Sequence, residues 1–254
     1  MIIANFKSNV VNFDRWAEDF INSCPPVMFN VGVALPSIYI TQYSLGIEHW
    51  PDEDNLENDF SRMAIGAQDV DHSSGSRTGA ISIEMLDEVG VEFVIIGHSE
   101  RREFFHEDND LIRKKIQSVN ESKIGRIILC IGETKEENKM GATKDVLKNQ
   151  LSVIDGFDLG KNFTIAYEPV WAIGSGQTPE PKDINEIHKY IKDVVQSVST
   201  NNHVPDVVYG GSVTDKNAES FFNEEFVDGA LVGGASLSGT TFANIVNIWR
   251  ENII

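Results

Sequence analysis

Eight short runs of apolar, mostly β-branched residues recur along this chain, and successive runs are separated by stretches long enough to hold a helix. The runs predict strands at Ile2–Phe6, Val27–Ala34, Met63–Ala67, Phe93–Ile96, Arg126–Ile131, Phe163–Tyr167, Asp206–Tyr209 and Gly229–Val232. Continuous apolar strands that alternate with helices are typical of a parallel sheet covered on both faces. Eight such units in 254 residues favour an α/β fold with a single domain, residues 1–254, closed into a (β/α)8 barrel. An open doubly wound sheet is the alternative.

The segments between the predicted strands carry helical periodicity. From Phe13 to Phe20, the apolar residues at 13, 16, 17 and 20 share one face of a helix. A second apolar stripe follows Pro181 and comprises Ile184, Ile187, Ile191, Val194, Val195 and Val198. Each stripe indicates a helix that packs one face against the sheet.

The charge of the chain limits its partners. The formal net charge is −18, which argues against nucleic acid and against anionic membrane surfaces as partners. The same field repels an anionic substrate, although salt confines that repulsion to about 8 Å. Any phosphate site must therefore be built locally from backbone N–H groups, with one lysine as the possible added charge.

The sequence shows no sign of a leader, a membrane span or a metal site. The N-terminus lacks a basic region followed by a long apolar stretch, and no apolar run reaches the length that a bilayer requires. The two cysteines, Cys24 and Cys130, are far apart and lack metal-ligand spacing. We therefore expect a soluble, cytoplasmic protein with reduced thiols and no bound metal.

Two stretches depart from the repeating pattern. Glu48–Asp59 is acidic and polar, and we interpret it as a solvated loop. Ser73–Gly79 is rich in turn-forming residues and follows the third predicted strand. Composition leaves open whether this second stretch is a mobile surface loop or a docking loop.

Polar residues stand at the carboxyl ends of three predicted strands, where barrels of this kind build their sites. Asn5 and Lys7 close the first strand, His98 follows the fourth and Glu168 follows the sixth. Taken alone, each has a structural explanation: solvation for a lysine, helix capping for a glutamate, a structural hydrogen bond for a histidine. Their convergence on one rim favours a functional interpretation.

Three glycine-rich turns also follow predicted strands, namely the sixth, seventh and eighth. They are Ala172–Gly176, Gly210–Ser212 and Gly233–Gly234. Glycine lets the backbone approach a ligand closely, and successive N–H groups can bind an anion without a charged side chain. Since turns after strands seven and eight commonly hold phosphate in barrels, these turns predict a phosphate site.

A carboxylate, an imidazole, an ammonium and a phosphate cradle together suit proton abstraction next to a carbonyl in a small phosphorylated sugar. The sequence carries no dinucleotide fingerprint and no Walker motif, which favours an isomerase without a cofactor. Two alternatives stay open. One is another phosphate-binding barrel isomerase, and the other is an inactive barrel that serves as a binding or structural protein.

Five segments resemble the triosephosphate isomerase family, in the same order and at the same spacing, from Met1 through the terminal helix. They are Ala4–Lys7, Gly97–Arg102, Ala166–Gly174, Tyr209–Ser212 and Asp228–Gly234. The resemblance implies a TIM barrel that acts as an intramolecular aldose–ketose isomerase in glycolysis and gluconeogenesis. It would interconvert dihydroxyacetone phosphate and D-glyceraldehyde 3-phosphate through an enediolate, without a cofactor, as a homodimer.

The resemblance also assigns roles to single residues. Glu168 is the expected base, and Lys7 is expected to supply positive charge to the substrate. His98 is expected to polarise the carbonyl as a neutral imidazole whose pKa is lowered by the helix that starts near Ser99, a tuning already known for this family. The remaining implied residues are Asn5, Glu100, Cys130 and Tyr209 in supporting roles, and Gly174, Ser212, Gly233 and Gly234, with Asn5 and Lys7, on the substrate. Cys130 is expected to be a packed thiol, not a nucleophile.

A mobile lid is implied at Pro169–Pro179, with Trp171 near its first hinge. Its members are Pro169, Val170, Trp171, Ala172, Ile173, Gly174, Ser175, Gly176, Gln177, Thr178 and Pro179. Closure would keep water from the enediolate, which can otherwise eliminate its phosphate. Pro179 replaces a frequent alanine and lacks an N–H. If the closed lid of the family bonds Tyr209 to that amide, the bond cannot form here, and we expect an altered lid equilibrium with intact chemistry.

Other departures from the family pattern gather around one loop. Asp69 stands where asparagine is common, Arg77 where an aromatic residue is usual, and Ala80 where glutamate is usual. The resemblance places this loop at the dimer contact, with Thr78 reaching the site of the partner. We expect a dimer with a re-formed interface in which Arg77 takes part in a new polar contact. Nearer the site, Phe6 and Ser8 replace a tryptophan and a methionine.

Overall fold

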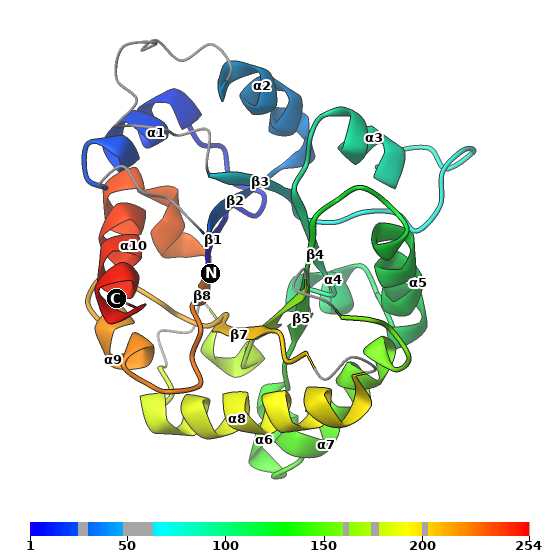
Figure 1. Cartoon of the computed structure of the whole chain (residues 1–254), viewed down its shortest axis with the longest axis vertical. Helices are drawn as coiled ribbons and strands as arrows, with labels where there is room; N and C mark the ends of the chain where they lie inside the picture. Colours follow the sequence, from blue (N-terminus) through cyan, green and yellow to red (C-terminus); the bar gives the residue numbers. More distant parts are fainter. Residues whose placement is uncertain (25–29, 48–62, 160–162, 174–177, 200–202, 254) are drawn as a thin grey trace.

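Eight parallel strands close into a barrel in the order β1 to β8, and helices surround it (Figure 1). The computed structural model describes residues 1–24, 30–47, 63–159, 163–173, 178–199 and 203–253. The strands are β1 Ile2–Asn5, β2 Val31–Leu35, β3 Ala64–Ala67, β4 Phe93–Ile96, β5 Arg126–Ile131, β6 Phe163–Tyr167, β7 Asp206–Tyr209 and β8 Ala230–Val232. The predicted (β/α)8 barrel is confirmed, and the open sheet is excluded because β1 pairs with both β2 and β8.

Some predicted strand ends differ from the observed ones. The strand predicted at Val27–Ala34 is observed from Val31 to Leu35, and residues 27–29 lie outside the described part of the chain. β1 ends at Asn5, β3 begins at Ala64 and β8 begins at Ala230, each one residue inside the predicted limit. At β8 the reason is Gly229, whose φ of 156° and close approach to the Met1 carbonyl leave no room for a side chain.

The helices lie outside the strands (Figure 1). They are α1 Phe13–Ile21, α2 Ser37–Ile47, α3 Ile83–Glu88, α4 Ser99–Phe104, α5 Asn109–Asn120, α6 Lys135–Lys139, α7 Thr143–Leu151, α8 Pro181–Val198, α9 Ala218–Phe222 and α10 Gly239–Ile253, with 3-10 turns η2 Ser152–Ile154, η3 Val170–Ala172 and η4 Gly234–Leu237. Both predicted stripes are confirmed. α1 buries its residues 13, 16, 17 and 20, and the residues of the α8 stripe are buried or packed against the core.

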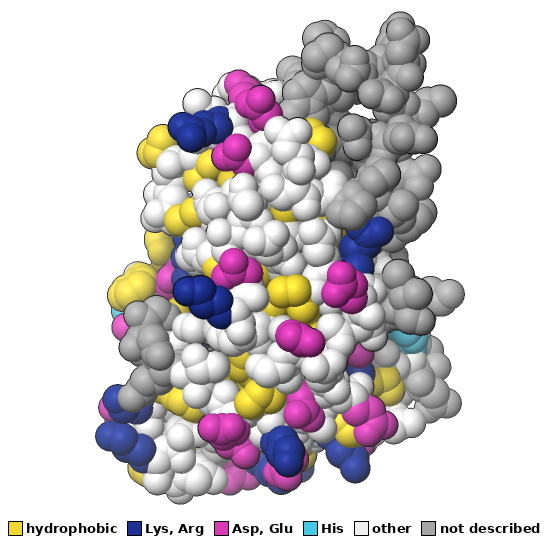
Figure 2. All heavy atoms as spheres, turned by 90° about the vertical axis from the view of Figure 1, so that its left-hand side faces the viewer, with side chains coloured by type: hydrophobic (Ala, Val, Ile, Leu, Met, Phe, Trp, Pro, Cys, Tyr) yellow, Lys and Arg dark blue, Asp and Glu magenta, His cyan; other side chains and the backbone are white. Residues whose placement is uncertain are grey.

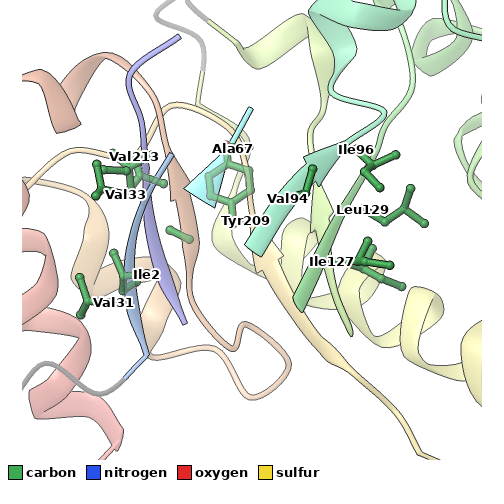
Figure 3. Packing of buried hydrophobic residues seen from close by; sticks show 14 of the residues in the cluster. Ile2, Val31, Val33, Ala67, Val94, Ile96, Ile127, Leu129, Tyr209 and Val213 are labelled. Carbon is green, nitrogen blue, oxygen red and sulfur yellow. The ribbon is translucent and has the colours of Figure 1, made fainter. Parts of the chain in front are cut away.

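Side chains alternate along each strand between the barrel interior and the layer beneath the helices. On β4, Phe93 and Ile95 belong to the interior cluster, whereas Val94 and Ile96 belong to the outer one. Figure 3 shows part of this outer layer, where residues of several neighbouring strands pack together. The alternation fixes which residue at each strand end points into the barrel.

The surface carries the expected excess of acidic residues in a mixed pattern. On the face that includes α1 and α10, acidic and basic side chains are interspersed (Figure 2).

None of the described helices combines the length and the apolar composition needed to cross a bilayer. The acidic stretch predicted as a loop at Glu48–Asp59 lies outside the described residues, whereas Ser73–Gly79 forms a loop without helix or strand.

Candidate active site

Strand alternation brings the predicted polar residues to one end of the barrel interior. Ile3 on β1 and Ala166 on β6 face the interior, so Asn5 and Glu168, two positions further along, face it at the carboxyl ends of their strands. A cavity of about 420 Å³ opens there. Its lining includes Asn5, Lys7, His98, Glu168, Ile173, Gly210, Gly211, Ser212, Gly233 and Gly234.

Glu168 is 2 % exposed and is held by two donors. Its Oε1 lies 3.0 Å from Nε2 of His98, and its Oε2 accepts the backbone N–H of Ser99 at 3.0 Å. Burial raises the pKa of Glu168, but the imidazole of His98 and the N–H of Ser99 outweigh burial and leave the pKa below its usual value. The carboxylate is therefore ionised and available as a base.

His98 forms the N-cap of α4, and this fixes its tautomer. Its Nδ1 accepts the backbone N–H of Glu100 at 3.2 Å, so in the neutral ring the proton is on Nε2, which faces Glu168. Burial lowers the pKa of His98, but the carboxylate of Glu168 outweighs burial and the net shift is upward. The expected lowering is thus not found in this arrangement, because the base and the imidazole are in contact.

Lys7 is held in a backbone conformation that is rare for a side chain of its size, with φ of 48°. Its N–H donates to Oδ1 of Asn5 at 3.0 Å, and its carbonyl accepts from Nε2 of Gln68 at 3.0 Å. Its ammonium donates to Oε1 of Glu100 at 2.6 Å. Asn5, Lys7 and Glu100 therefore form one connected group.

Gln68 supports the turn that carries Lys7, a role that the sequence analysis did not predict. Its amide donates to the carbonyls of Lys7 and of Ala34, and so ties the end of β2 to the turn after β1. Its place directly after β3 was a usable signal, because polar residues at that end of a strand are candidates for the site.

The predicted phosphate turns line the same cavity. Gly233 and Gly234 open η4, and nothing lies within 4 Å of the position that a Cβ would take at Gly234. Ser212 donates its hydroxyl to the carbonyl of Ala172 at 2.6 Å, which connects this turn to the predicted lid segment. Gly174, also predicted to bind phosphate, lies outside the described residues.

Two glycines next to the base are required by packing. A Cβ at Gly132 would collide with the carbonyl of Glu168, and a Cβ at Gly210 would lie 2.7 Å from Cγ of Glu168. Gly210 was predicted as part of a phosphate turn, and its neighbour Gly211 similarly passes against the ring of Tyr209. These glycines let the backbone close around the base.

The described part of the predicted lid segment contacts a buried acid, Glu133, that the sequence analysis also missed. Trp171 donates its indole N–H to Oε1 of Glu133 at 2.8 Å, and Tyr167 donates its hydroxyl to the same carboxylate. Glu133 is fully buried. Pro169–Ile173 and Thr178–Pro179 are described, whereas residues 174–177, Gly174, Ser175, Gly176 and Gln177, are not.

The two other residues predicted in supporting roles are Cys130 and Tyr209. Cys130 and Tyr209 are both fully buried, and burial raises the pKa of the thiol and of the phenol above their usual values. A buried thiol with a raised pKa is a packed side chain and a poor nucleophile.

In the part of the chain that the structure describes, no group of three or more His, Cys, Asp or Glu side chains is placed to hold a metal ion.

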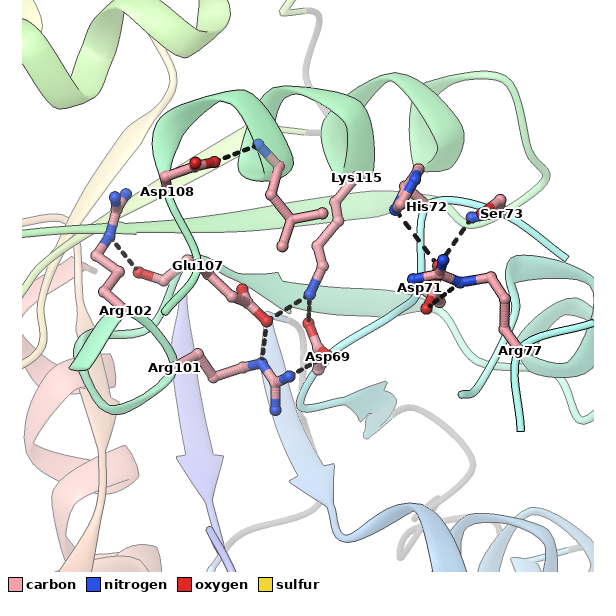
Figure 4. A network of polar contacts seen from close by, with 12 residues as sticks. Asp69, Asp71, His72, Ser73, Arg77, Arg101, Arg102, Glu107, Asp108 and Lys115 are labelled. Carbon is pink, nitrogen blue, oxygen red and sulfur yellow. Dashed lines mark hydrogen bonds and ion pairs between the residues drawn. The ribbon is translucent and has the colours of Figure 1, made fainter. Parts of the chain in front are cut away.

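The loop predicted as a dimer contact lies apart from this cavity. Arg77 donates its Nε to Oδ2 of Asp71 at 2.9 Å within the same loop, and Thr78 is exposed. Asp69 joins a network with Arg101, Glu107 and Lys115 (Figure 4). Ala80 and Arg77 both line a cavity of about 480 Å³ beside this network.

A parallel (β/α)8 barrel with a carboxylate, an imidazole and an ammonium around one cavity defines a barrel enzyme equipped for proton transfer on a small substrate. The family model described as triosephosphate isomerase matches residues 1–249. The chain belongs to the triosephosphate isomerase family.

Curated relatives with that name come from several bacteria. The triosephosphate isomerase of Alkaliphilus metalliredigens is 44% identical over 74% of this chain and 77% of its own length. That of Erwinia tasmaniensis is 41% identical over 85% of this chain and 82% of its own length. That of Baumannia cicadellinicola is 39% identical over 97% of this chain and 95% of its own length. The similarity therefore extends over nearly the whole barrel.

Proposed function

We propose that this protein interconverts dihydroxyacetone phosphate and D-glyceraldehyde 3-phosphate by moving a proton between adjacent carbons. The observation that carries the proposal is the 3.0 Å contact between Nε2 of His98 and Oε1 of Glu168 at the wall of a cavity that Lys7 also lines. A base, a donor and a cation are thereby within reach of one small substrate.

Glu168 acts as the base in this proposal. Its carboxylate removes a proton from the carbon next to the carbonyl and returns it to the neighbouring carbon, so that no electrons leave the substrate. Its lowered pKa keeps it ionised near neutral pH. The absence of a Cβ at Gly132 and Gly210 leaves room for the backbone and side chain of this residue.

His98 donates Nε2–H to the substrate oxygen on which negative charge develops. Nδ1 is occupied by the N–H of Glu100, so the ring can donate only through Nε2. When the substrate oxygen takes this donor, Glu168 is released from His98 and can turn toward the carbon. Lys7, which also lines the cavity, contributes positive charge, and Glu100 holds its ammonium in place.

The phosphate group rests on backbone N–H groups of the turns at Ser212 and Gly233–Gly234. These turns are supported by their position after β7 and β8 and by the open space at Gly234. Backbone dipoles bind a dianion without a large cationic patch, which suits a chain with a net charge of −18. The lid then closes from the Trp171 side, which requires the bond between Trp171 and Glu133 to give way or to move with it.

A coupled assay of turnover in both directions tests this function. Wild type is expected to turn over both triose phosphates, and Glu168→Asp is expected to lose about 10²-fold or more in kcat, because a shorter side chain misplaces the base by about 1 Å. Glu186→Asp, on the exposed face of α8, is the matched control and keeps wild-type rates. Folded wild-type protein without turnover would favour an inactive barrel or an isomerase for another phosphorylated substrate.

A homodimer is the second part of the proposal. Phe104 and Phe105 are 65% and 62% exposed beside the loop that carries Arg77 and Thr78. Phe105 and Arg77 line the same cavity, so an apolar and a polar surface adjoin there. Sedimentation at micromolar protein concentration tests it, and an active species that is only monomeric would refute it.

We also propose that the protein is cytoplasmic, because reducing conditions suit the two buried free thiols.

A further inference from the structure

The guanidinium of Arg102 connects three segments beneath the candidate active site. Its Nε donates to the carbonyl of Gly97 at 2.8 Å, and its Nη2 donates to the carbonyl of Cys130 at 3.2 Å. Its Nη1 donates to Oδ1 of Asn109, at the start of α5, at 3.0 Å. One planar side chain therefore holds the ends of β4, β5 and a helix in a fixed relation.

These bonds lie where the strand ladder ends. The register of β4 with β5 stops at the pair Ile96 and Leu129. Beyond it, Gly97 turns away from β5 with φ of 72° to start α4, while β5 continues through Cys130. The guanidinium supplies donors to both carbonyls at the point where the two backbones separate.

The positions of both reacting groups of the proposed function, His98 and Glu168, depend on the strand ends that Arg102 connects. His98 follows Gly97 directly, so the carbonyl that Arg102 holds belongs to the peptide that carries the imidazole. On the other side, the backbone N–H of Glu168 donates to the carbonyl of Ile131 at 2.7 Å, one residue beyond Cys130. A shift between Gly97 and Cys130 would change the distance between His98 and Glu168.

Arg102 differs from its neighbour on α4. Arg101 turns toward Asp69 and Glu107 and pairs with both carboxylates, whereas Arg102 points away from that network (Figure 4). Among the described residues, the acceptors of Arg102 are the neutral oxygens of Gly97, Asn109 and Cys130, and no carboxylate lies within ion-pair distance. A half-buried charge without an ionic partner is costly, which indicates that the geometry of its donors matters more than ion pairing.

We propose that Arg102 is a positioning residue for the proposed isomerase reaction, which holds the ends of β4 and β5 together and so sets the distance between His98 and Glu168. The inference rests on the proposed function for its kinetic consequence. Its structural consequence, the placement of the His98 ring, does not depend on turnover.

Arg102→Lys keeps the positive charge and removes the planar guanidinium that donates to three acceptors. We expect kcat to fall by about 10- to 100-fold with KM changed by less than about threefold, because reacting groups are displaced while the phosphate turns are untouched. The matched control is Arg113→Lys, since Arg113 also donates to two backbone carbonyls, those of Val153 and Asp155, both at 2.9 Å. This control should lose comparable thermal stability and keep kcat within about twofold.

A spectroscopic readout separates this proposal from the proposed function. The ¹H–¹⁵N resonance of Nε2–H of His98, recorded without substrate, should shift in Arg102→Lys and stay in place in Arg113→Lys. If wild type lacks turnover, the proposed function fails, and the shift alone still decides the positioning role. Asn109→Ala, which removes only one of the three acceptors, serves where Arg102→Lys does not fold, and it should shift the resonance in the same direction by less. An unmoved resonance with kcat near wild type, or an equal loss of kcat in Arg113→Lys, would overturn the proposal.

Discussion

The Nε2 atom of His98 and the Oε1 atom of Glu168 lie 3.0 Å apart, inside a site where both side chains are almost fully buried. Burial acts against the charged form of each, yet their contact moves the pKa of Glu168 down and the pKa of His98 up. When a substrate oxygen separates the pair, the cause that raises the pKa of His98 is removed and burial again lowers it. We therefore predict that the neutral imidazole expected from the sequence forms when substrate occupies the site.

Replacement of His98 by asparagine should raise the pKa of Glu168 relative to wild type. The imidazole is the largest cause that lowers this pKa, while burial, which raises it, stays in place. The carboxyl chemical shift of Glu168, followed by ¹³C NMR against pH, measures the change directly.

The same change has a signed effect on stability. A carboxyl group whose folded pKa lies below its unfolded value of 4.5 stabilises the protein above that value, and the contribution is lost as pH falls through the folded pKa. The free energy of unfolding of wild type minus that of His98→Asn should therefore grow as pH rises between about 3 and 6. A difference that stays flat across this range would contradict the assigned pair.

Gln68→Ala should weaken the hold on Lys7. The variant loses the bonds to the carbonyls of Lys7 and Ala34 and leaves Lys7 in its left-handed conformation without that support. We expect a loss of about 1–2 kcal/mol in the free energy of unfolding, since two part-buried acceptors lose a donor. We also expect KM for triose phosphate to rise, because the ammonium of Lys7 is less well placed.

Chemical denaturation and steady-state kinetics measure both effects. Gln117→Ala is the control, because among the described residues the exposed side-chain amide of Gln117 bonds only to Glu121, the C-cap of α5. Equal kinetics in the two variants would show that Gln68 has no part in placing Lys7.

The sequence predicted the barrel well because its signal repeats. Eight apolar runs separated by helix-length segments leave few other ways to bury the strands, and the glycines and polar residues at strand ends follow from that frame. Glu133, Gln68 and Arg102 were not predicted as site residues, because their importance lies in partners far away in the chain. Glu133 carries no sign in the sequence that the indole of Trp171 will donate to it. The direction of the His98 pKa likewise depends on one rotamer of Glu168, which no sequence pattern specifies.

Pro179→Ala should change the motion of the lid and leave the chemistry intact. Pro179 is buried at the far end of the lid segment and has no N–H to offer, while the hydroxyl of Tyr209 is buried near Ser212. Alanine restores a donor that the closed lid can use. We expect the rate of lid opening, followed by Trp171 fluorescence after a temperature jump, to change by about threefold. The change in kcat should not exceed this factor, because kcat changes only to the extent that lid motion limits turnover.

Pro205→Ala, in the turn before β7, is the control for the general effect of replacing a buried proline. It should leave the fluorescence relaxation as in wild type. Unchanged relaxation and turnover in Pro179→Ala would show that residue 179 has no influence on closure.

Asp71 organises the loop that we propose as the dimer contact, and its removal should weaken the dimer. Its carboxylate accepts the N–H of Ser73 at 3.1 Å and Nε of Arg77 at 2.9 Å, so it fixes the loop from both sides. In Asp71→Ala the loop must be ordered at association, at a cost of about 1–2 kcal/mol for each residue that becomes fixed. We expect the dissociation constant from sedimentation to rise by about tenfold or more, since that corresponds to about 1.4 kcal/mol. Asp155→Ala, which removes an acid outside this loop, directly after η2, should leave association unchanged. If activity per subunit falls on dilution in Asp71→Ala and recovers with concentration, the loop acts through association, whereas a concentration-independent loss would place its effect within one subunit.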